Sequence, residues 1–396
     1  MSNIFIYIWP WKMKYFKASF YFVRYDILGK IIRETYRQFK WKIWLLSILF
    51  IFLFFLSQVL HLIFRICDEL FYRDFKKIKI KEPVFIIANP RSGTTYLHRL
   101  VSLDEDRFTY THFLYTFQMT TSFVRFTAIF RWIDARSGNI IRKVINQIDK
   151  ALWGGWNDIH SMRFDKAEED EQVFAQALMS PGVFIPFPYL HLIHGNKFLD
   201  REPIEIRNSV MDFYESSVQR FVFATGPNKT YLAKNVMSTG RFKSLLQRFP
   251  DARFIYISRH PYQALPSFVS MCSSMYRWHS PEISDNSPAK KAWAQLGIDF
   301  YKYSREMKTT IPDNQFVELK YDDLLRDPKG EVLKIYQHFG WTASEKFLEK
   351  LEAEKLSNRN YHSSHEYSLE QFGLQKELIY QELAETMDEL GFSKDC

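Results

Sequence analysis

The stretch PVFIIANPRSGTTYLHRLVSL, at residues 83–103, places the tightest constraint on the fold. It begins with VFIIA, at residues 84–88, a continuous apolar run that is too short to form a buried helix. Runs of this kind are typical of central strands in parallel sheets, which helices cover on both faces. The polar residues 89–93 end the strand, and from Thr94 apolar residues recur at helical spacing. The sequence therefore predicts an α/β protein with a central parallel sheet.

A strand, a tight polar loop and a helix N-terminus together form an arrangement that binds phosphate. The first turn of a helix offers unpaired N–H groups and the positive end of the helix dipole. Gly93 lets the backbone approach an anion closely, and Arg91 can offer a charged fork. We therefore expect an anion site formed by Arg91, Ser92, Gly93, Thr94, Thr95 and Tyr96.

The loop does not match the ATP-binding loop of the Walker A type. That motif requires the pattern G-x-x-x-x-G-K-[ST]. Ala88 stands in the place of the first glycine, and Thr94 stands in the place of the lysine. A kinase-like, nucleotide-dependent P-loop transferase remains an alternative, but it would need another lysine and a magnesium ligand.

The loop resembles the 5′-phosphosulfate loop of sulfotransferases that use 3′-phosphoadenosine-5′-phosphosulfate (PAPS). PRSGTT, at residues 90–95, matches the P-[RK]-S-G-T-T form of that family. A second stretch resembles the family's 3′-phosphate element, because Arg259 follows a predicted buried strand and Ser267 lies eight residues later. An arginine fork and a serine hydroxyl suit a dianionic phosphate. The resemblance implies that PAPS is the sulfuryl donor.

The resemblance covers about residues 83–374 and implies a P-loop-like, three-layer α/β fold with a central parallel sheet. A helical insert, at about residues 108–223, is expected to lie over the acceptor site. The implied activity is transfer of a sulfuryl group from PAPS to a hydroxyl or amine. No metal is expected, because Arg91, Lys234 and helix N-termini can stabilise the charge. A catalytically inactive scaffold of the same fold is the other alternative, and both phosphate elements being intact argues against it.

A general base is needed to take the proton of the acceptor hydroxyl, and this is usually a histidine or a carboxylate. An acidic cluster at residues 168–171 opens a predicted helix downstream of His160. Crowding by like charges raises the proton affinity of a carboxylate, although acidic residues in a first turn also complement the helix dipole. We predict Glu171 as the base, with Asp170 and His160 as alternatives and Lys234 as a catalytic cation.

One departure from the family pattern limits which catalytic residues the resemblance supplies. Many soluble relatives have a Lys-x-His pair where this chain has Lys234, Asn235 and Val236, so the resemblance supplies the lysine but not the base. Near the end, residues 357–374 resemble a C-terminal loop of the branch with a PRSGTT motif. Arg359 in that loop is predicted to bind the cofactor.

Residues 44–64, WLLSILFIFLFFLSQVLHLIF, contain no Asp, Glu, Lys or Arg and predict a transmembrane helix, because such a run can span roughly 30 Å of hydrocarbon. A buried or interfacial helix is the alternative. The expected layout is a basic and aromatic segment at 1–43, a linker at 65–82 and the sulfotransferase domain at 83–396. Basic residues flank both sides of the span, so a domain in the bacterial cytoplasm and one in the Golgi lumen both remain open.

Composition narrows the partners. The net charge of +8 suits an anionic ligand or membrane surface, and no Lys/Arg block interleaved with aromatic residues predicts nucleic-acid binding. Three widely separated cysteines and scattered histidines predict neither a disulfide framework nor a metal site. The predicted acceptor is a small molecule, lipid or glycan, and the oligomeric state is left open.

Overall fold

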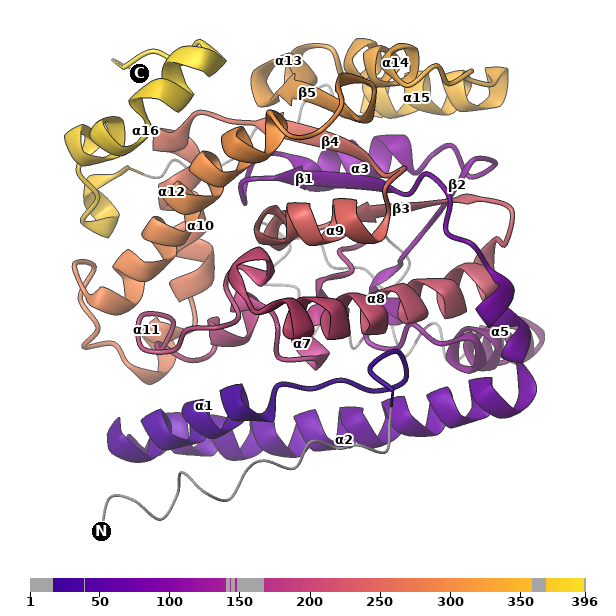
Figure 1. The fold of residues 1–396 in the computed structure, drawn as a ribbon, viewed down its shortest axis with the longest axis horizontal. Helices are drawn as coiled ribbons and strands as arrows, with labels where there is room; N and C mark the ends of the chain where they lie inside the picture. Colours follow the sequence, from indigo (N-terminus) through magenta and orange to yellow (C-terminus); the bar gives the residue numbers. More distant parts are fainter. Residues whose placement is uncertain are drawn as a thin grey trace.

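The computed structural model describes residues 17–38, 40–139, 143, 147, 167–357 and 368–394. His160 and Arg359 lie outside the described residues. The described strands form one parallel sheet in the order β2-β3-β1-β4-β5 (Figure 1). Their bounds are β1 (Val84–Ala88), β2 (Phe108–Tyr110), β3 (Thr230–Lys234), β4 (Arg253–Ser258) and β5 (Phe316–Lys320).

Strand β1 lies in the middle of the sheet and is buried along its whole length. Its side chains alternate between two hydrophobic clusters, with Ile86 facing one cluster and Phe85 the other. Helices cover both faces, as expected for a buried parallel strand. On one face lie α3 (Thr94–Val101), α13 (Tyr321–Arg326), α14 (Pro328–His338) and α15 (Glu345–Ser357). On the other lie α8 (Ile204–Thr225), α9 (Phe242–Arg248), α10 (Pro261–Ser273) and α12 (Pro288–Lys308). The predicted three-layer α/β fold is confirmed.

The strand order places the site. After β1 the chain forms β2 and β3 on one side of this strand and then β4 and β5 on its other side, so β1 is the point at which the order reverses. In open parallel sheets, ligands bind outside the carboxyl ends of the strands at such a point. The register pairs Ile86 of β1 with Lys234 at the end of β3 and with Ile255 of β4. The loop at 89–93 therefore lies between the ends of β3 and β4.

The segment between α3 and β3 contains β2, α4 (Phe113–Thr116), α5 (Thr121–Arg136), α7 (Glu171–Gln176) and α8. Later in the chain, α11 (Tyr276–His279) and α16 (Lys376–Leu390) pack near α10 and α12. The 3-10 turns are η1 (Arg73–Lys77), η2 (Pro181–Phe184), η3 (Leu199–Arg201), η4 (Val236–Arg241), η5 (Asp313–Gln315) and η6 (Glu370–Phe372).

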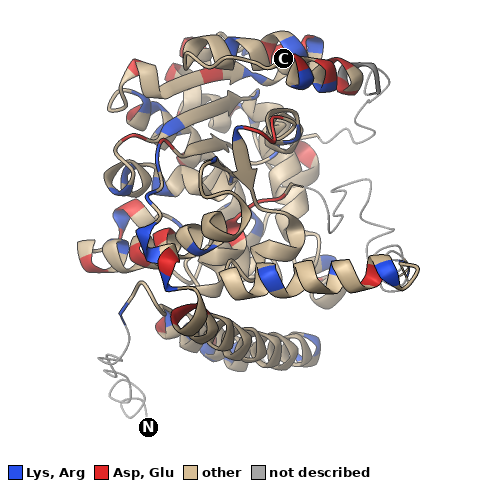
Figure 2. Ribbon diagram, turned by 90° about the vertical axis from the view of Figure 1, so that its right-hand side faces the viewer, with Lys and Arg blue, Asp and Glu red and all other residues tan. Residues whose placement is uncertain are grey.

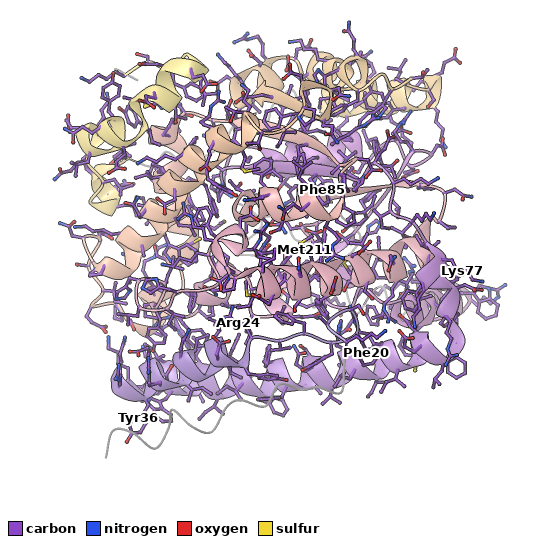
Figure 3. The ribbon with its side chains drawn as sticks, in the orientation of Figure 1. Phe20, Arg24, Tyr36, Lys77, Phe85 and Met211 are labelled. Atoms are coloured by element: carbon purple, nitrogen blue, oxygen red, sulfur yellow. The ribbon has the colours of Figure 1, made fainter. Side chains whose placement is uncertain are left out.

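Two N-terminal helices, α1 (Tyr25–Gln38) and α2 (Trp41–Phe71), lie side by side below α8 along the lower edge of Figure 1. Within the described part of the chain, α2 is the one helix that is long and apolar enough to cross a membrane. It includes the expected span at 44–64 and continues for seven residues into the expected linker. Figure 3 shows Phe85 in the sheet and Met211 on α8, between the sheet and these two helices.

Candidate active site

The loop after β1 has a tightly constrained backbone. Arg91 and Gly93 both adopt left-handed conformations, with φ of 71° and 83°. A Cβ atom on Gly93 would lie 2.7 Å from the Tyr321 ring, so another residue at this position would be strained and would clash. Gly93 caps the N-terminus of α3, whose first turn contains Thr94, Thr95 and Tyr96. The predicted arrangement of strand, tight loop and helix N-terminus is therefore present.

Arg91 connects the two elements that resemble phosphate sites. Its Nε donates a hydrogen bond to Ser267 Oγ at 3.0 Å, and its carbonyl oxygen accepts one from Arg259 Nη1 at 2.7 Å. The Arg259 guanidinium also lies 4.3 Å from the centre of the Tyr321 ring, the same ring that closes over Gly93. The structure thus brings together residues that are far apart in sequence, and the Arg259 bond supports the left-handed conformation of Arg91.

Ser92 is the most enclosed member of the loop. Its side chain is fully buried, and its Oγ has no hydrogen-bond partner among the described residues. A buried hydroxyl without a partner costs free energy, so such a group is suited to bind an oxygen atom of a ligand. Thr94 is also buried beside it at the start of α3.

Lys234 links the loop to the acidic cluster. Its side chain is fully buried at the end of β3, and its Nζ lies 3.1 Å from Thr95 Oγ1 and 2.6 Å from Glu169 Oε1. The lysine therefore places the Glu169 carboxylate next to the first turn of α3. Glu169 keeps 24% of its side chain exposed, so it can be reached by a ligand.

Glu171, the predicted base, lies elsewhere in the site. Its two carboxylate oxygens accept hydrogen bonds of 2.6 and 2.8 Å from the two terminal nitrogens of Arg241. Arg241 also donates to the Met179 carbonyl at 3.1 Å and packs over the Phe174 ring. This ion pair holds α7 against η4, so both oxygens of Glu171 already have a strong partner.

Asp170 is fully enclosed. It accepts hydrogen bonds from Tyr214 at 2.5 Å, from Asn235 at 2.9 Å and from Tyr231 at 3.1 Å. Burial raises the pKa of the Asp170 carboxyl, although these three hydrogen bonds act in the opposite direction. The network fixes the turn before α7 and hence the direction in which Glu169 projects.

Sequence reasoning did not single out Glu169 or His98. His98 lies on α3, and neither of its buried ring nitrogens has a hydrogen-bond partner among the described residues. Burial, together with the charges of Lys234 and Arg99, keeps the pKa of His98 well below its ordinary value. The ring is therefore neutral and adds no charge beside Lys234. Within the described ranges, no group of three or more His, Cys, Asp or Glu residues is placed to hold a metal ion.

The chain matches one protein-family model and several known proteins. The family model described as "Sulfotransferase family" matches residues 83–345. An omega-hydroxy-beta-dihydromenaquinone-9 sulfotransferase, Stf3, from Mycobacterium bovis is 26% identical over 79% of this chain and 76% of its own length. The crystal structure of the sulfotransferase STF1 from Mycobacterium tuberculosis has a TM-score of 0.62 at 21% identity and covers 86% of each chain.

The crystal structure of the sulfotransferase STF9 from Mycobacterium avium has a TM-score of 0.66 at 16% identity, covering 83% of this chain and 82% of that one. These two structures establish the likeness in fold. The family model spans well over half of the chain and includes the loop, Lys234 and Arg259. The protein therefore belongs to the sulfotransferase family.

Proposed function

We propose that this sulfotransferase moves a sulfuryl group from PAPS to the hydroxyl of an apolar, lipid-like acceptor, with Glu169 as the general base. One observation carries the proposal: buried Lys234 contacts both Thr95 of the anion loop and the Glu169 carboxylate. A positive charge and a carboxylate thus lie beside the loop at which an activated anionic group would be bound. That combination suits acid–base chemistry on a transferring anion.

The donor fits the residues that are present. Ser92 Oγ, the hydroxyls of Thr94 and Thr95 and the N-terminus of α3 would hold the 5′ side. Arg259 and Ser267 would hold the 3′-phosphate, with Arg91 between the two groups. When bound, PAPS supplies a sulfuryl group activated by its link to a phosphate.

In the proposed reaction, each charged side chain near the loop has a distinct role. Glu169 accepts the proton of the acceptor hydroxyl as the oxygen forms its bond to sulfur. The bond between sulfur and the phosphate oxygen breaks, and that oxygen leaves with the negative charge. Lys234 and the N–H groups of α3 are placed to stabilise that charge. Glu171 and Asp170 position the segment through Arg241 and through the tyrosine pair.

A lipid-like acceptor has two supports. The relative Stf3 is named for a hydroxylated menaquinone, a long apolar molecule. In this chain, the segment with Glu169 continues into α7, which contacts the apolar helix α2 through a hydrogen bond from Gln58 to the Gln176 carbonyl at 3.1 Å. A glycan or an amine acceptor would be expected in a more polar setting.

The test is transfer of radiolabelled sulfate from PAPS by the detergent-solubilised full chain. Long-chain polyprenyl or quinone-type alcohols are compared with monosaccharides and with simple amines of similar concentration. We expect sulfated product with the apolar alcohols and loss of that product in Glu169→Gln. Transfer to sugars but not to apolar alcohols would contradict the acceptor class, and transfer of phosphate from ATP would contradict the donor.

A further inference from the structure

The membrane helix α2 has a polar stripe along one side. Ser47, Gln58, His61, Arg65 and Asp68 are all buried, and they recur at intervals of three, four or eleven residues. Residues so spaced share one face of a helix. The stripe faces α1 at Ser47 and the catalytic domain from Gln58 to Asp68.

Along the first part of the stripe, each polar group has a partner on another element. Ser47 Oγ lies 3.1 Å from Thr35 Oγ1 of α1. His61 Nδ1 lies 2.9 Å from Gln118 Oε1, just before α5. A further hydrogen bond joins Gln58 to the segment that follows Glu169. Together these contacts hold α2 against α1 and the catalytic domain.

At the end of the stripe the contacts involve charges. Arg65 donates to the Ser19 and Phe20 carbonyls, at 2.8 and 3.0 Å. Asp68 accepts from the backbone N–H groups of Thr121 and Ser122 at the start of α5, at 3.0 and 2.7 Å. It also pairs at 3.1 Å with Arg220 of α8, and both side chains are almost completely buried.

These contacts conflict with a helix that crosses the bilayer. The stripe from Ser47 to Asp68 extends for roughly 30 Å at 1.5 Å per residue, about the thickness of the hydrocarbon core. Crossing would either draw α1, α5 and α8 into the hydrocarbon or leave the polar stripe unpaired there. Buried polar groups without partners are expensive in hydrocarbon, and charged groups more so.

The opposite side of α2 is apolar and uncovered. The exposed side chains there include Leu45, Leu49, Phe52, Leu56, Ile63 and Leu70. The surface continues onto α5, because the Phe64 ring packs against Phe123 and Phe126. Most of the exposed large hydrophobic side chains in the described ranges lie on α1, α2 and α5, a larger apolar area than soluble proteins normally present to water.

The edges of this surface contain aromatic and basic residues, which in membrane proteins commonly lie at the level of the lipid headgroups. Trp41 is 72% exposed at one end of α2, with Lys42 beside its ring. On α5, the Arg136 guanidinium lies 3.7 Å from the Trp132 ring. In Figure 2, the helix along the lower edge of the molecule is tan over most of its length. The charged residues of α2 are Lys42 near its start and Arg65, Asp68 and Glu69 near its end. Figure 3 shows Tyr36 and Lys77 at opposite ends of the surface. Interfacial aromatic residues with lysine and arginine favour a membrane with anionic lipids.

We infer that α2 lies in the plane of the membrane, and that its outer face and α5 are immersed together in one leaflet. A lipid layer suits this surface better than a second copy of the chain does. Two copies meeting face to face would bring their basic edges against each other, whereas anionic headgroups complement them. In this arrangement, the residues that precede α2 in the chain and those that follow it lie on the same side of the bilayer.

Topology is tested with the full chain in sealed vesicles and a membrane-impermeant maleimide. Arg33→Cys and Lys77→Cys, at highly exposed positions before and after α2, are made in a background with Cys67→Ala and Cys396→Ser; Cys272 is buried. We expect both positions to react, or both to be protected, in the same vesicle preparation. Reaction of one position while the other needs permeabilisation would overturn the inference.

Binding is tested by flotation with vesicles of phosphatidylcholine and about one-third phosphatidylglycerol. Phe126→Glu/Phe130→Glu on α5 and Leu49→Glu/Phe52→Glu on α2 are each expected to lower the bound fraction by about tenfold or more. The control, Leu325→Glu/Leu378→Glu, changes exposed leucines of α13 and α16 on the far side of the molecule and should bind as the wild type does. Unchanged binding of the α5 variant, or a detergent-free wild-type dimer that ignores vesicles, would contradict the inference.

Discussion

At the scale of single residues, Lys234 joins the parts of the proposed mechanism. Its Nζ contacts Thr95 of the loop that we propose to bind the donor and Glu169, the carboxylate that we propose as the base. The two neighbouring acidic residues have other partners, since Asp170 is enclosed by tyrosines and Glu171 is paired with Arg241. Three consecutive acidic residues therefore have three different environments.

The role of Glu169 can be separated from that of Glu171. We expect Glu169→Gln to lower the rate of transfer by about 10²- to 10⁴-fold, the usual contribution of a general base, while donor affinity changes little. Glu171→Gln should mainly lower thermal stability, because it weakens the Arg241 pair. Single-turnover sulfation and thermal unfolding measure the two effects. Wild-type turnover in Glu169→Gln, with loss in Glu171→Gln, would return the base to Glu171.

The predicted 3′-phosphate contact can be tested at Arg259. We expect Arg259→Ala to raise the Kd for 3′-phosphoadenosine-5′-phosphate (PAP) by roughly tenfold to a hundredfold, the scale of one lost charge-assisted hydrogen bond. Arg253→Ala is the matched control, because Arg253 begins β4, the strand that Arg259 follows, and pairs with Glu82 at the opposite end of that strand. Calorimetry should show an unchanged Kd for that control. Equal affinities for all three proteins would remove Arg259 from the site.

Asp170 gives a prediction for pH. Its folded-state pKa is raised by burial, so the folded protein holds this proton more tightly than the unfolded chain does. The resulting stability is present below the unfolded pKa of about 3.9 and is lost as pH rises through the higher folded pKa. Asp170→Asn has no proton to lose at this position. The free energy of unfolding of the wild type minus that of Asp170→Asn should therefore fall as pH rises from about 4. Denaturant unfolding over this range checks it, and a constant difference would contradict it.

At the scale of elements, the junction of α2, α5 and α8 holds the N-terminal helices to the catalytic domain. Asp68 caps the start of α5 and neutralises Arg220 at the same time. Asp68→Ala removes both interactions and leaves a buried guanidinium with fewer partners. We expect a loss of about 3–5 kcal/mol in the free energy of unfolding, the usual result of breaking a buried ion pair.

The matched control for this prediction is Asp74→Ala. Asp74 is 66% exposed and pairs with Lys77 on the surface, so its loss should leave the melting temperature nearly unchanged. Thermal unfolding of the two variants in the same detergent makes the comparison. If both variants melt like the wild type, α2 is not an integral part of the folded domain.

The elements that sequence predicted well are those whose signal is local. The apolar run of β1 and the glycine after it specify a strand and a tight loop within ten residues, and the structure has both. The choice among residues 168–171 was not local. It depends on Arg241 and Lys234, which lie more than sixty residues away and select their carboxylates by packing.

The polar stripe of α2 was visible in the sequence in part. Gln58, His61 and Arg65 recur at helical spacing, a pattern that favours a helix with one protected polar face. A count of apolar residues alone predicts a transmembrane helix that ends before Arg65. The residues that pair with the stripe, such as Arg220, are distant in sequence and could not be found without the tertiary fold.

At the scale of the whole molecule, one short segment connects the candidate site to the buried polar stripe of α2. The chain passes from Glu169 through α7 to Gln176, whose carbonyl accepts the hydrogen bond from Gln58 of α2. A protein seated in one leaflet through α2 and α5 would therefore keep its base close to the lipid phase. The proposed position of the protein in the membrane is therefore consistent with the proposed lipid-like acceptor.

The most direct test of the central proposal is calorimetric binding of PAP and of ADP to the full chain in detergent with EDTA present. The full chain is needed because Asp68 and Glu69 of α2 are the partners of buried Arg220. We predict metal-independent binding of PAP that is at least about tenfold tighter than that of ADP, since the 3′-phosphate supplies a charge-assisted contact. ADP binding that equals or exceeds PAP binding, or that requires Mg²⁺, would contradict a PAPS-dependent mechanism.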